Sequence, residues 1–166
     1  MKWSAAVFGF VLCSHLQGET GYAAWLRYAP IDNPNLRQTY EIFPAVVVTL
    51  DNSPVMTAAR DELLRGIQTM LGRTLRIEKE LTNESCFLFG TIASVRSAAP
   101  EIALPDALID DAYVLKTTAA HGHRIFLITA SNDRGVLYGT FALLRKIALG
   151  QELDHIGEQQ SPYAPI

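Results

Sequence analysis

Cysteine is scarce in this sequence, with only Cys13 and Cys86 among its 166 residues. Cys13 lies in an apolar N-terminal run that is typical of a cleaved signal, so only Cys86 would stay in the mature chain. A single cysteine cannot form an internal disulfide. Because Cys86 lies in the apolar run 86–89, we expect a buried, unreactive thiol; the alternative is a nucleophile activated by a histidine nearby in space.

An excess of positive charge is also missing. The chain has 14 Lys and Arg against 17 Asp and Glu, which makes the net charge −3 and the pI about 5.8. Nucleic acid and anionic lipid are therefore not expected as partners, because both are bound through clustered basic side chains. After the N-terminal run, the sequence has no apolar stretch long enough to cross a membrane, so no membrane association is expected.

The usual signatures of catalytic and cofactor sites are absent as well. The sequence has neither the Gly-x-Ser-x-Gly turn of serine hydrolases nor a phosphate-binding loop, and the only candidate glycine turn has the single glycine Gly90. His121 and His123 lack a third metal ligand at a recognisable spacing. Five acids are better explained as cap or turn residues than as a glycosidase pair: Asp32, Asp51, Asp110, Asp111 and Asp133. We expect no cofactor, no metal site and no catalytic residue in this chain.

The N-terminus has the features of a secretory signal peptide. Lys2 precedes the apolar residues 5–13, a run of signal length, and the polar residues that follow allow cleavage between Ser14 and Gly18. We assign residues 1–18 to the signal and expect a secreted, extracellular protein; the alternative is a buried N-terminal strand or helix. Secretion makes Asn83, in an N-glycosylation sequon at a polar turn, a candidate glycosylation site.

Hydrophobic periodicity predicts one α/β (α+β) domain over residues 19–150. Residues 45–50 are typical of a strand buried on both faces, and Ser53-Pro54 begins a helix that ends at Gly72. We expect a mixed β-sheet of about five strands with two long helices mainly on one face, followed by an extended linker over residues 151–166. The remaining predicted elements are strands at 74–79, 85–89, 112–117 and 124–129, a hairpin turn at 121–123, and helices at 92–98 and 133–149.

The second long helix contains two glycines four residues apart, Gly135 and Gly139. Glycine inside a helix costs about 0.5–1 kcal/mol relative to alanine, so two on adjacent turns need a reason. Either another domain approaches this stripe, with Tyr138 and Phe141 adding apolar area beside it, or the glycines pack against the domain's own sheet. Trp25, in an aromatic N-terminal stretch, is a further candidate for an interdomain contact; its alternative role is to stack on a sugar.

Three stretches carry a resemblance to a known family: GYAAWLRY at 21–28, NDRGVLYGTFALLR at 132–145 and SPYAPI at 161–166. In this order they resemble the N-terminal domain of the α-glucuronidases of glycoside hydrolase family 67, in a secreted fungal-type form. The resemblance covers nearly all of the mature chain. It implies an α/β domain similar to the one before the barrel in β-hexosaminidases, followed in the whole enzyme by a (β/α)8 catalytic barrel and a helical region.

The same resemblance implies an activity for the whole enzyme. Members of the family remove glucuronic acid, often 4-O-methylated, from the terminal xylose of xylooligosaccharides during xylan degradation, with carboxylates of the barrel as general acid and base. No such residue can be transferred to this sequence, which is expected to stop before the barrel. We therefore expect a non-catalytic domain that braces the barrel of the same polypeptide. The alternatives are a free-standing secreted carbohydrate-binding module and a small independent hydrolase.

Overall fold

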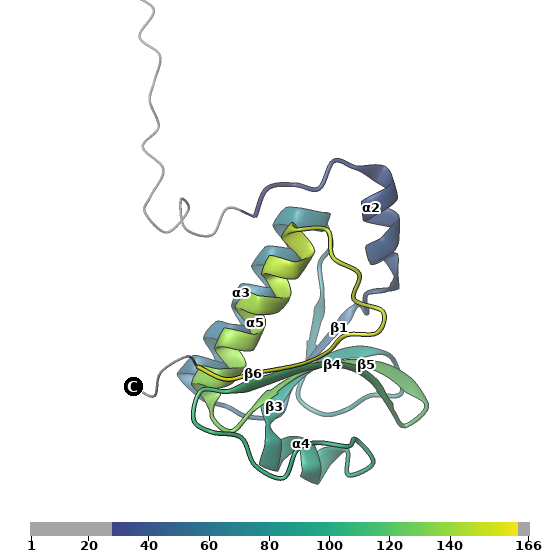
Figure 1. The fold of residues 1–166 in the computed structure, drawn as a ribbon. Helices are drawn as coiled ribbons and strands as arrows, with labels where there is room; N and C mark the ends of the chain where they lie inside the picture. Colours follow the sequence, from purple (N-terminus) through teal and green to yellow (C-terminus); the bar gives the residue numbers. More distant parts are fainter. Residues whose placement is uncertain (1–27, 163–166) are drawn as a thin grey trace, which may run out of the picture.

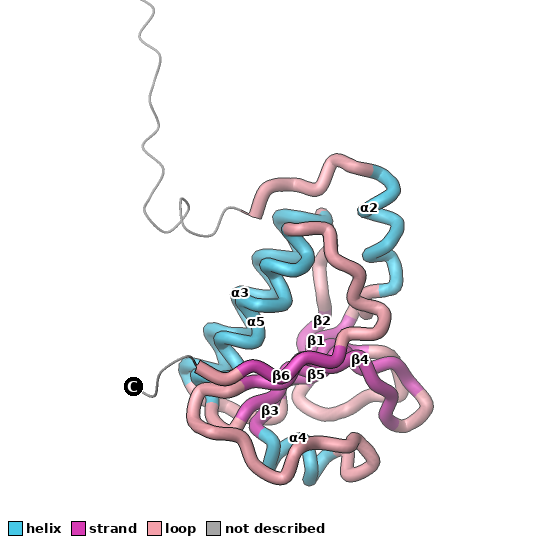
Figure 2. Tube along the Cα trace, in the orientation of Figure 1, coloured by secondary structure: helices cyan, strands magenta, loops and turns pink. Residues whose placement is uncertain are grey.

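The computed structural model describes residues 28–162, which form one sheet with helices on both faces (Figures 1 and 2). The elements in chain order are α2 (Pro34–Thr39), the 3-10 helix η1 (Tyr40–Ile42), β1 (Val46–Thr49), α3 (Pro54–Leu71), β2 (Arg76–Glu78), β3 (Cys86–Thr91), α4 (Ile92–Ala98), β4 (Tyr113–Ala120), β5 (His123–Ala130), α5 (Asp133–Ala148) and β6 (Gly157–Gln160). The strand order is β2-β1-β3-β5-β4-β6. β1, β2, β3 and β5 are mutually parallel, whereas β4 is antiparallel to both β5 and β6. The predicted mixed α/β fold is confirmed.

Helix α3 begins and ends at the residues that the sequence predicts. The Ser53 hydroxyl accepts a hydrogen bond from the Met56 backbone N–H at 3.0 Å, and Pro54 occupies the first helical position. Gly72 ends the helix in a left-handed conformation with a φ of 71°, which glycine adopts without steric cost. Local sequence is therefore sufficient to delimit this helix.

Helix α5 is capped in a similar way. The Asn132 side-chain oxygen accepts a hydrogen bond from the Gly135 backbone N–H at 2.9 Å, so Asn132 is the N-cap. Arg145 and Lys146 lie in the last turn, where positive charge favours the negative end of the helix dipole. The chain then turns at Gly150, whose φ is 69°.

A tight turn joins β4 to β5. His121 and Gly122 have φ values of 52° and 81°, and two consecutive positive φ values are what the type I′ turn of a two-residue hairpin requires. The turn sets the register in which Ala120 faces His123 and Tyr113 faces Ala130. The predicted hairpin is confirmed.

The structure adds a sixth strand that the sequence does not predict. Gly157–Gln160 pair with β4 at the edge of the sheet, within the segment interpreted as a linker. Leu153 is buried, and its carbonyl accepts a hydrogen bond from the Thr117 hydroxyl at 2.7 Å. The linker assignment is thus wrong for residues 153–160. A strand of Gly-Glu-Gln-Gln has no apolar alternation, so only its pairing with β4 produces it.

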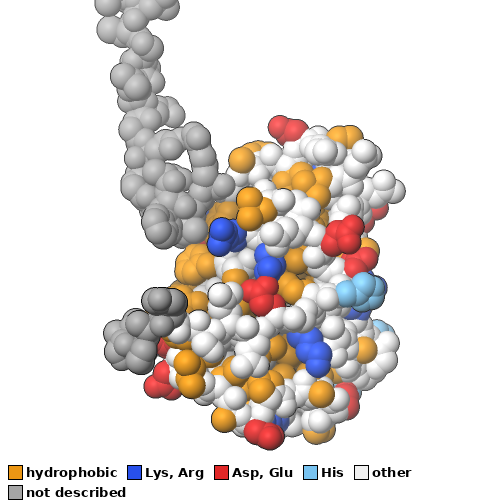
Figure 3. Space-filling view, in the orientation of Figure 1, with side chains coloured by type: hydrophobic (Ala, Val, Ile, Leu, Met, Phe, Trp, Pro, Cys, Tyr) orange, Lys and Arg blue, Asp and Glu red, His pale blue; other side chains and the backbone are white. Residues whose placement is uncertain are grey.

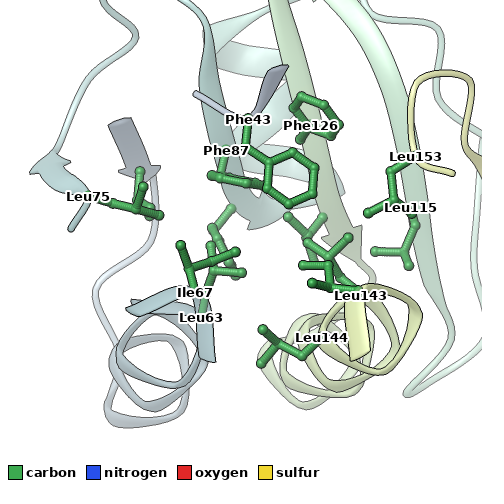
Figure 4. Packing of buried hydrophobic residues seen from close by; sticks show 14 of the residues in the cluster. Phe43, Leu63, Ile67, Leu75, Phe87, Leu115, Phe126, Leu143, Leu144 and Leu153 are labelled. Atoms are coloured by element: carbon green, nitrogen blue, oxygen red, sulfur yellow. The ribbon is translucent and has the colours of Figure 1, made fainter. Parts of the chain in front are cut away.

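The sheet buries apolar side chains on both faces, as the continuous β-branched and aromatic runs require. On one face α3 and α5 lie side by side over a cluster that includes Phe43, Phe87 and Phe126, whose ring centroids are 5.3–5.4 Å apart (Figures 1 and 4). On the other face α4 and the loop after it cover a smaller cluster that includes Leu88 and Leu127. Both long helices therefore lie on one face, as predicted.

Candidate functional site

The carboxyl ends of β1 and β3 are the place where open α/β sheets usually bind ligands. Asp51, just after β1, lies at this place in the fold and lines a pocket of about 200 Å³ there. Its Oδ2 accepts a hydrogen bond from the Thr91 backbone N–H at 2.7 Å, and its Oδ1 accepts one from the Ser94 hydroxyl. Thr91 is itself the N-cap of α4. The carboxylate thus joins β1 to α4, the structural role expected of it.

Asp111 is the other predicted turn acid that the fold uses structurally. It is buried, with a positive φ of 64°, and its Oδ1 accepts hydrogen bonds of 3.0 Å from the Asn132 amide and from Nε of Arg134. A second nitrogen of Arg134 lies 3.0 Å from its Oδ2. This forked contact ties the turn before β4 to the start of α5. The carboxylate is occupied by these partners and is not poised for acid–base chemistry.

The two glycines of α5 pack against the domain's own sheet. A methyl group built on Gly135 would lie 2.6 Å from the Cβ of Ala130 and 2.8 Å from the Ala112 carbonyl oxygen. One built on Gly139 would lie 3.0 Å from a methyl of Ile128. Both glycines are buried. Their assignment as interdomain contacts is therefore wrong, because β4 and β5 occupy the space beside them.

Helix α5 nevertheless keeps an apolar outer face. Tyr138 is 41% exposed and Leu149 is 62% exposed, while Phe141 and Ala142 are half-buried. Figure 3 shows hydrophobic side chains gathered on the side of the molecule where α3 and α5 lie, interrupted by a few charged groups. Tyr138 and Phe141 therefore stay candidates for an interdomain contact. Leu149 was not predicted from the sequence as a contact residue, although its spacing of seven residues from Ala142 indicates that both lie on the same helix face.

A groove runs between α5 and the edge strand β6. Its volume is about 360 Å³, and Tyr113, Ala142, Leu149 and Gln160 are among its lining residues. Burial and the negative charge of a neighbouring glutamate raise the pKa of Tyr113 to about 12, so the phenol is neutral at physiological pH. Nothing in the lining resembles a catalytic pair, and the groove is better suited to contact than to chemistry.

Tyr28 attaches the end of the aromatic N-terminal stretch to α3. Its hydroxyl donates a hydrogen bond to the buried carboxylate of Glu62, and the guanidinium of Arg65 lies 5.6 Å from the centre of its ring. An anchoring role is thus observed at the last residue of that stretch. Trp25, the interdomain candidate in the same stretch, lies outside the described residues.

Within the described residues, His121, His155 and Asn83 of the sequon are exposed. His121 is in the hairpin turn beside Glu101, with 3.6 Å between its Nε2 and a carboxylate oxygen. Within residues 28–162, no three His, Cys, Asp or Glu side chains are placed to hold a metal ion. Asn83 is exposed in the loop before β3, so the sequon is accessible.

Cys86 is fully buried in the central strand β3. Burial, together with the charge of Glu84, raises the pKa of its thiol to about 12. The thiolate is the reactive form, so the thiol has almost no nucleophilic character at neutral pH. This confirms the expectation of an inert cysteine.

We predict that Cys86 in a Cys13→Ser variant does not react with Ellman's reagent at about pH 8 while the protein is folded. The same thiol should react completely once urea unfolds the chain, because its pKa then returns to about 8.5. The absorbance at both conditions measures the difference. Rapid reaction of the folded protein would show that β3 is open to solvent.

Comparisons with known proteins add what the geometry alone does not give. The sequence model for the N-terminus of glycosyl hydrolase family 67 matches residues 24–143. The chain belongs to this family. The family 67 N-terminal domain is 34% identical over 168 residues to alpha-glucuronidase A of Emericella nidulans, a match that covers 95% of this chain and 19% of the relative. It is 30% identical over 157 residues to an alpha-glucuronidase of Hypocrea jecorina, covering 89% of this chain and 18% of the relative.

The family 67 domain spans about a fifth of the length of the curated relatives that it matches. These relatives are named as α-glucuronidases, a class of glycoside hydrolases, and the chain matches only their N-terminal domain. A solved structure of a family GH115 4-O-methyl-α-glucuronidase has the same fold, with a TM-score of 0.55 and 20% identity over 73% of this chain and 18% of that one. None of the helices in residues 28–162 is long and apolar enough to cross a membrane.

Proposed function

We propose that this chain is the non-catalytic N-terminal domain of a secreted α-glucuronidase that removes (4-O-methyl)glucuronic acid from xylooligosaccharides. The observation that carries the proposal is the match to the family 67 N-terminus across most of the chain. Two acids at turns of the fold accept structural hydrogen bonds. They are Asp111, which is buried, and Asp51, which follows β1. The domain would brace the catalytic barrel of the same polypeptide.

The location proposed for the enzyme is the extracellular space. The signal-like residues 1–18 support secretion. Asn83 is exposed in a loop, where oligosaccharyltransferase can reach it. We propose that Asn83 carries an N-linked glycan. An extracellular enzyme would meet xylan-derived oligosaccharides directly.

A free-standing carbohydrate-binding module is less well supported. Such a module stacks sugars on a row of exposed aromatic rings, and the large hydrophobic residues exposed in the described part of the chain include only one aromatic, Tyr138. The other three are Ile77, Ile109 and Leu149. The sheet faces are covered by helices, so no flat binding platform is available on them.

Sequencing the transcript through and beyond the codon for Ile166 tests the proposal first. We expect the reading frame to continue into a region of barrel length. The purified 166-residue chain should then release no glucuronic acid from a 4-O-methylglucuronoxylooligosaccharide, whereas the longer polypeptide should release it. A stop codon directly after Ile166, or hydrolysis by the short chain, would contradict the proposal.

A further inference from the structure

We propose that the outer face of α5 and the groove between α5 and β6 form the surface on which the polypeptide following Gln160 docks. This inference rests on the proposed function, because it requires a domain after this one. Its occupant is the next domain of the same chain.

The outer face of α5 carries an uncovered apolar stripe. Tyr138, Ala142 and Leu149 are spaced by four and seven residues, which places them on one side of three successive turns. Tyr138 and Leu149 are two of the four large hydrophobic residues that are exposed in residues 28–162. The other two, Ile77 and Ile109, lie on β2 and in the loop before β4. Exposed Arg145 lies on the same face between Ala142 and Leu149, so the stripe is apolar at both ends with one cation between them. Large exposed hydrophobic residues grouped on one face mark an interaction surface.

The groove continues the stripe toward the edge of the sheet. Ala142 and Leu149 belong to both, while Tyr113 of β4 and Gln160 of β6 line the groove. Across it, Nζ of Lys146 lies 2.6 Å from a carboxylate oxygen of Glu158, which holds the edge strand against the helix. The groove lining is mixed, because Arg145, Lys146 and other polar side chains lie beside the apolar ones. The partner surface should therefore combine apolar side chains facing Tyr113 and Leu149 with a carboxylate that suits the exposed Arg145.

The path of the chain places its continuation beside this surface. Gln160, the last residue of β6, pairs with Tyr113, and the side chain of Tyr113 lies against Gly139 in the middle of α5. The chain thus leaves the sheet next to the turn that carries Tyr138 and Ala142. The six residues from Gln160 to Ile166 reach about 20 Å at full extension. A domain attached after them starts within reach of the stripe but far along the sheet from Ile77, since β2 is the opposite edge strand.

The linkage also makes this contact favourable. Joining two surfaces by a short segment turns docking into an intramolecular event, so even a modest apolar patch is covered most of the time. β6, the last strand before the chain leaves the sheet, lines the groove itself. Only a short segment therefore separates the groove from the next domain.

Single-cysteine labelling tests the surface in two proteins, the 166-residue chain and the longer polypeptide. In the 166-residue chain a Cys13→Ser background leaves only buried Cys86, and Tyr138→Cys or Leu149→Cys is introduced into this background. Labelling is read by mass spectrometry of the peptide that carries the introduced cysteine, so any cysteine beyond residue 166 does not contribute. The matched control is Ile77→Cys, because Ile77 is exposed on β2 at the opposite edge of the sheet. We expect all three introduced thiols to react rapidly with a maleimide in the short chain. In the longer polypeptide, positions 138 and 149 should react at least about tenfold more slowly, and the rate at position 77 should be unchanged.

Several outcomes would overturn the inference. Unchanged labelling at 138 and 149, with or without slower labelling at 77, would place the next domain elsewhere and leave the proposed function intact. Slow labelling at 138 and 149 already in the short chain would assign the surface to the chain's own N-terminal residues or, if it depends on concentration, to a second copy. A transcript that ends at Ile166 would remove both the inference and the proposed function.

Discussion

Replacing Gly135 with valine is expected to lower the free energy of unfolding by about 3 kcal/mol or more. A Cβ at this position would lie 2.6 Å from the Cβ of Ala130 and 2.8 Å from the Ala112 carbonyl oxygen, closer than real contacts of this kind. Neither neighbour can move away easily, because Ala130 is paired in the sheet and the Ala112 carbonyl is backbone. Urea unfolding of the purified chain, followed by circular dichroism, measures the change.

The matched control for this substitution is Gly157→Ala. Gly157 lies in the edge strand β6, and a Cβ built on it meets no atom within 4 Å. Its replacement should change stability by no more than about 0.5 kcal/mol. Equal stability of the two variants would mean that α5 lies farther from β4 and β5 than the structure shows, and the glycines would again be available to another domain.

Truncation of Phe87 to alanine is expected to destabilise the fold by about 3–5 kcal/mol. Phe87 is fully buried in the central strand β3, and its ring lies 5.4 Å from those of both Phe43 and Phe126. Alanine would leave a cavity at the centre of the larger core cluster, because strands on both sides fix the backbone around it. The midpoint of urea unfolding is the measurement.

Phe141→Ala is the matched control, since it removes the same side chain from the half-buried outer face of α5. In the 166-residue chain it should cost about 1–2 kcal/mol, clearly less than Phe87→Ala, because part of the Phe141 ring is already in contact with water. If the two phenylalanines had equal effects, the core would not be centred on Phe43, Phe87 and Phe126.

Local sequence signals determined most of the secondary structure of this protein. Ser53 and Pro54 start α3 and Gly72 ends it, each through a hydrogen bond or a dihedral preference that needs only a few neighbouring residues. The same holds for Asn132 at α5 and for the turn at His121 and Gly122. The strands with continuous apolar runs were equally predictable, because burial on both faces leaves that pattern in the sequence. The family, too, was recognisable from three ordered stretches and is shown by the comparisons.

Tertiary structure alone decided the rest. The four residues of β6, a glycine and three polar residues, form a strand only because β4 presents an unpaired edge to them. Gly135 and Gly139 suited a contact with another domain as well as one with the sheet, and the closeness of Ala130 and Ile128 decides for the sheet. The sequence likewise does not reveal that the chain leaves β6 beside the outer face of α5. Local patterns specify which residues are buried, whereas the identity of the surface that buries them depends on contacts between residues far apart in the chain.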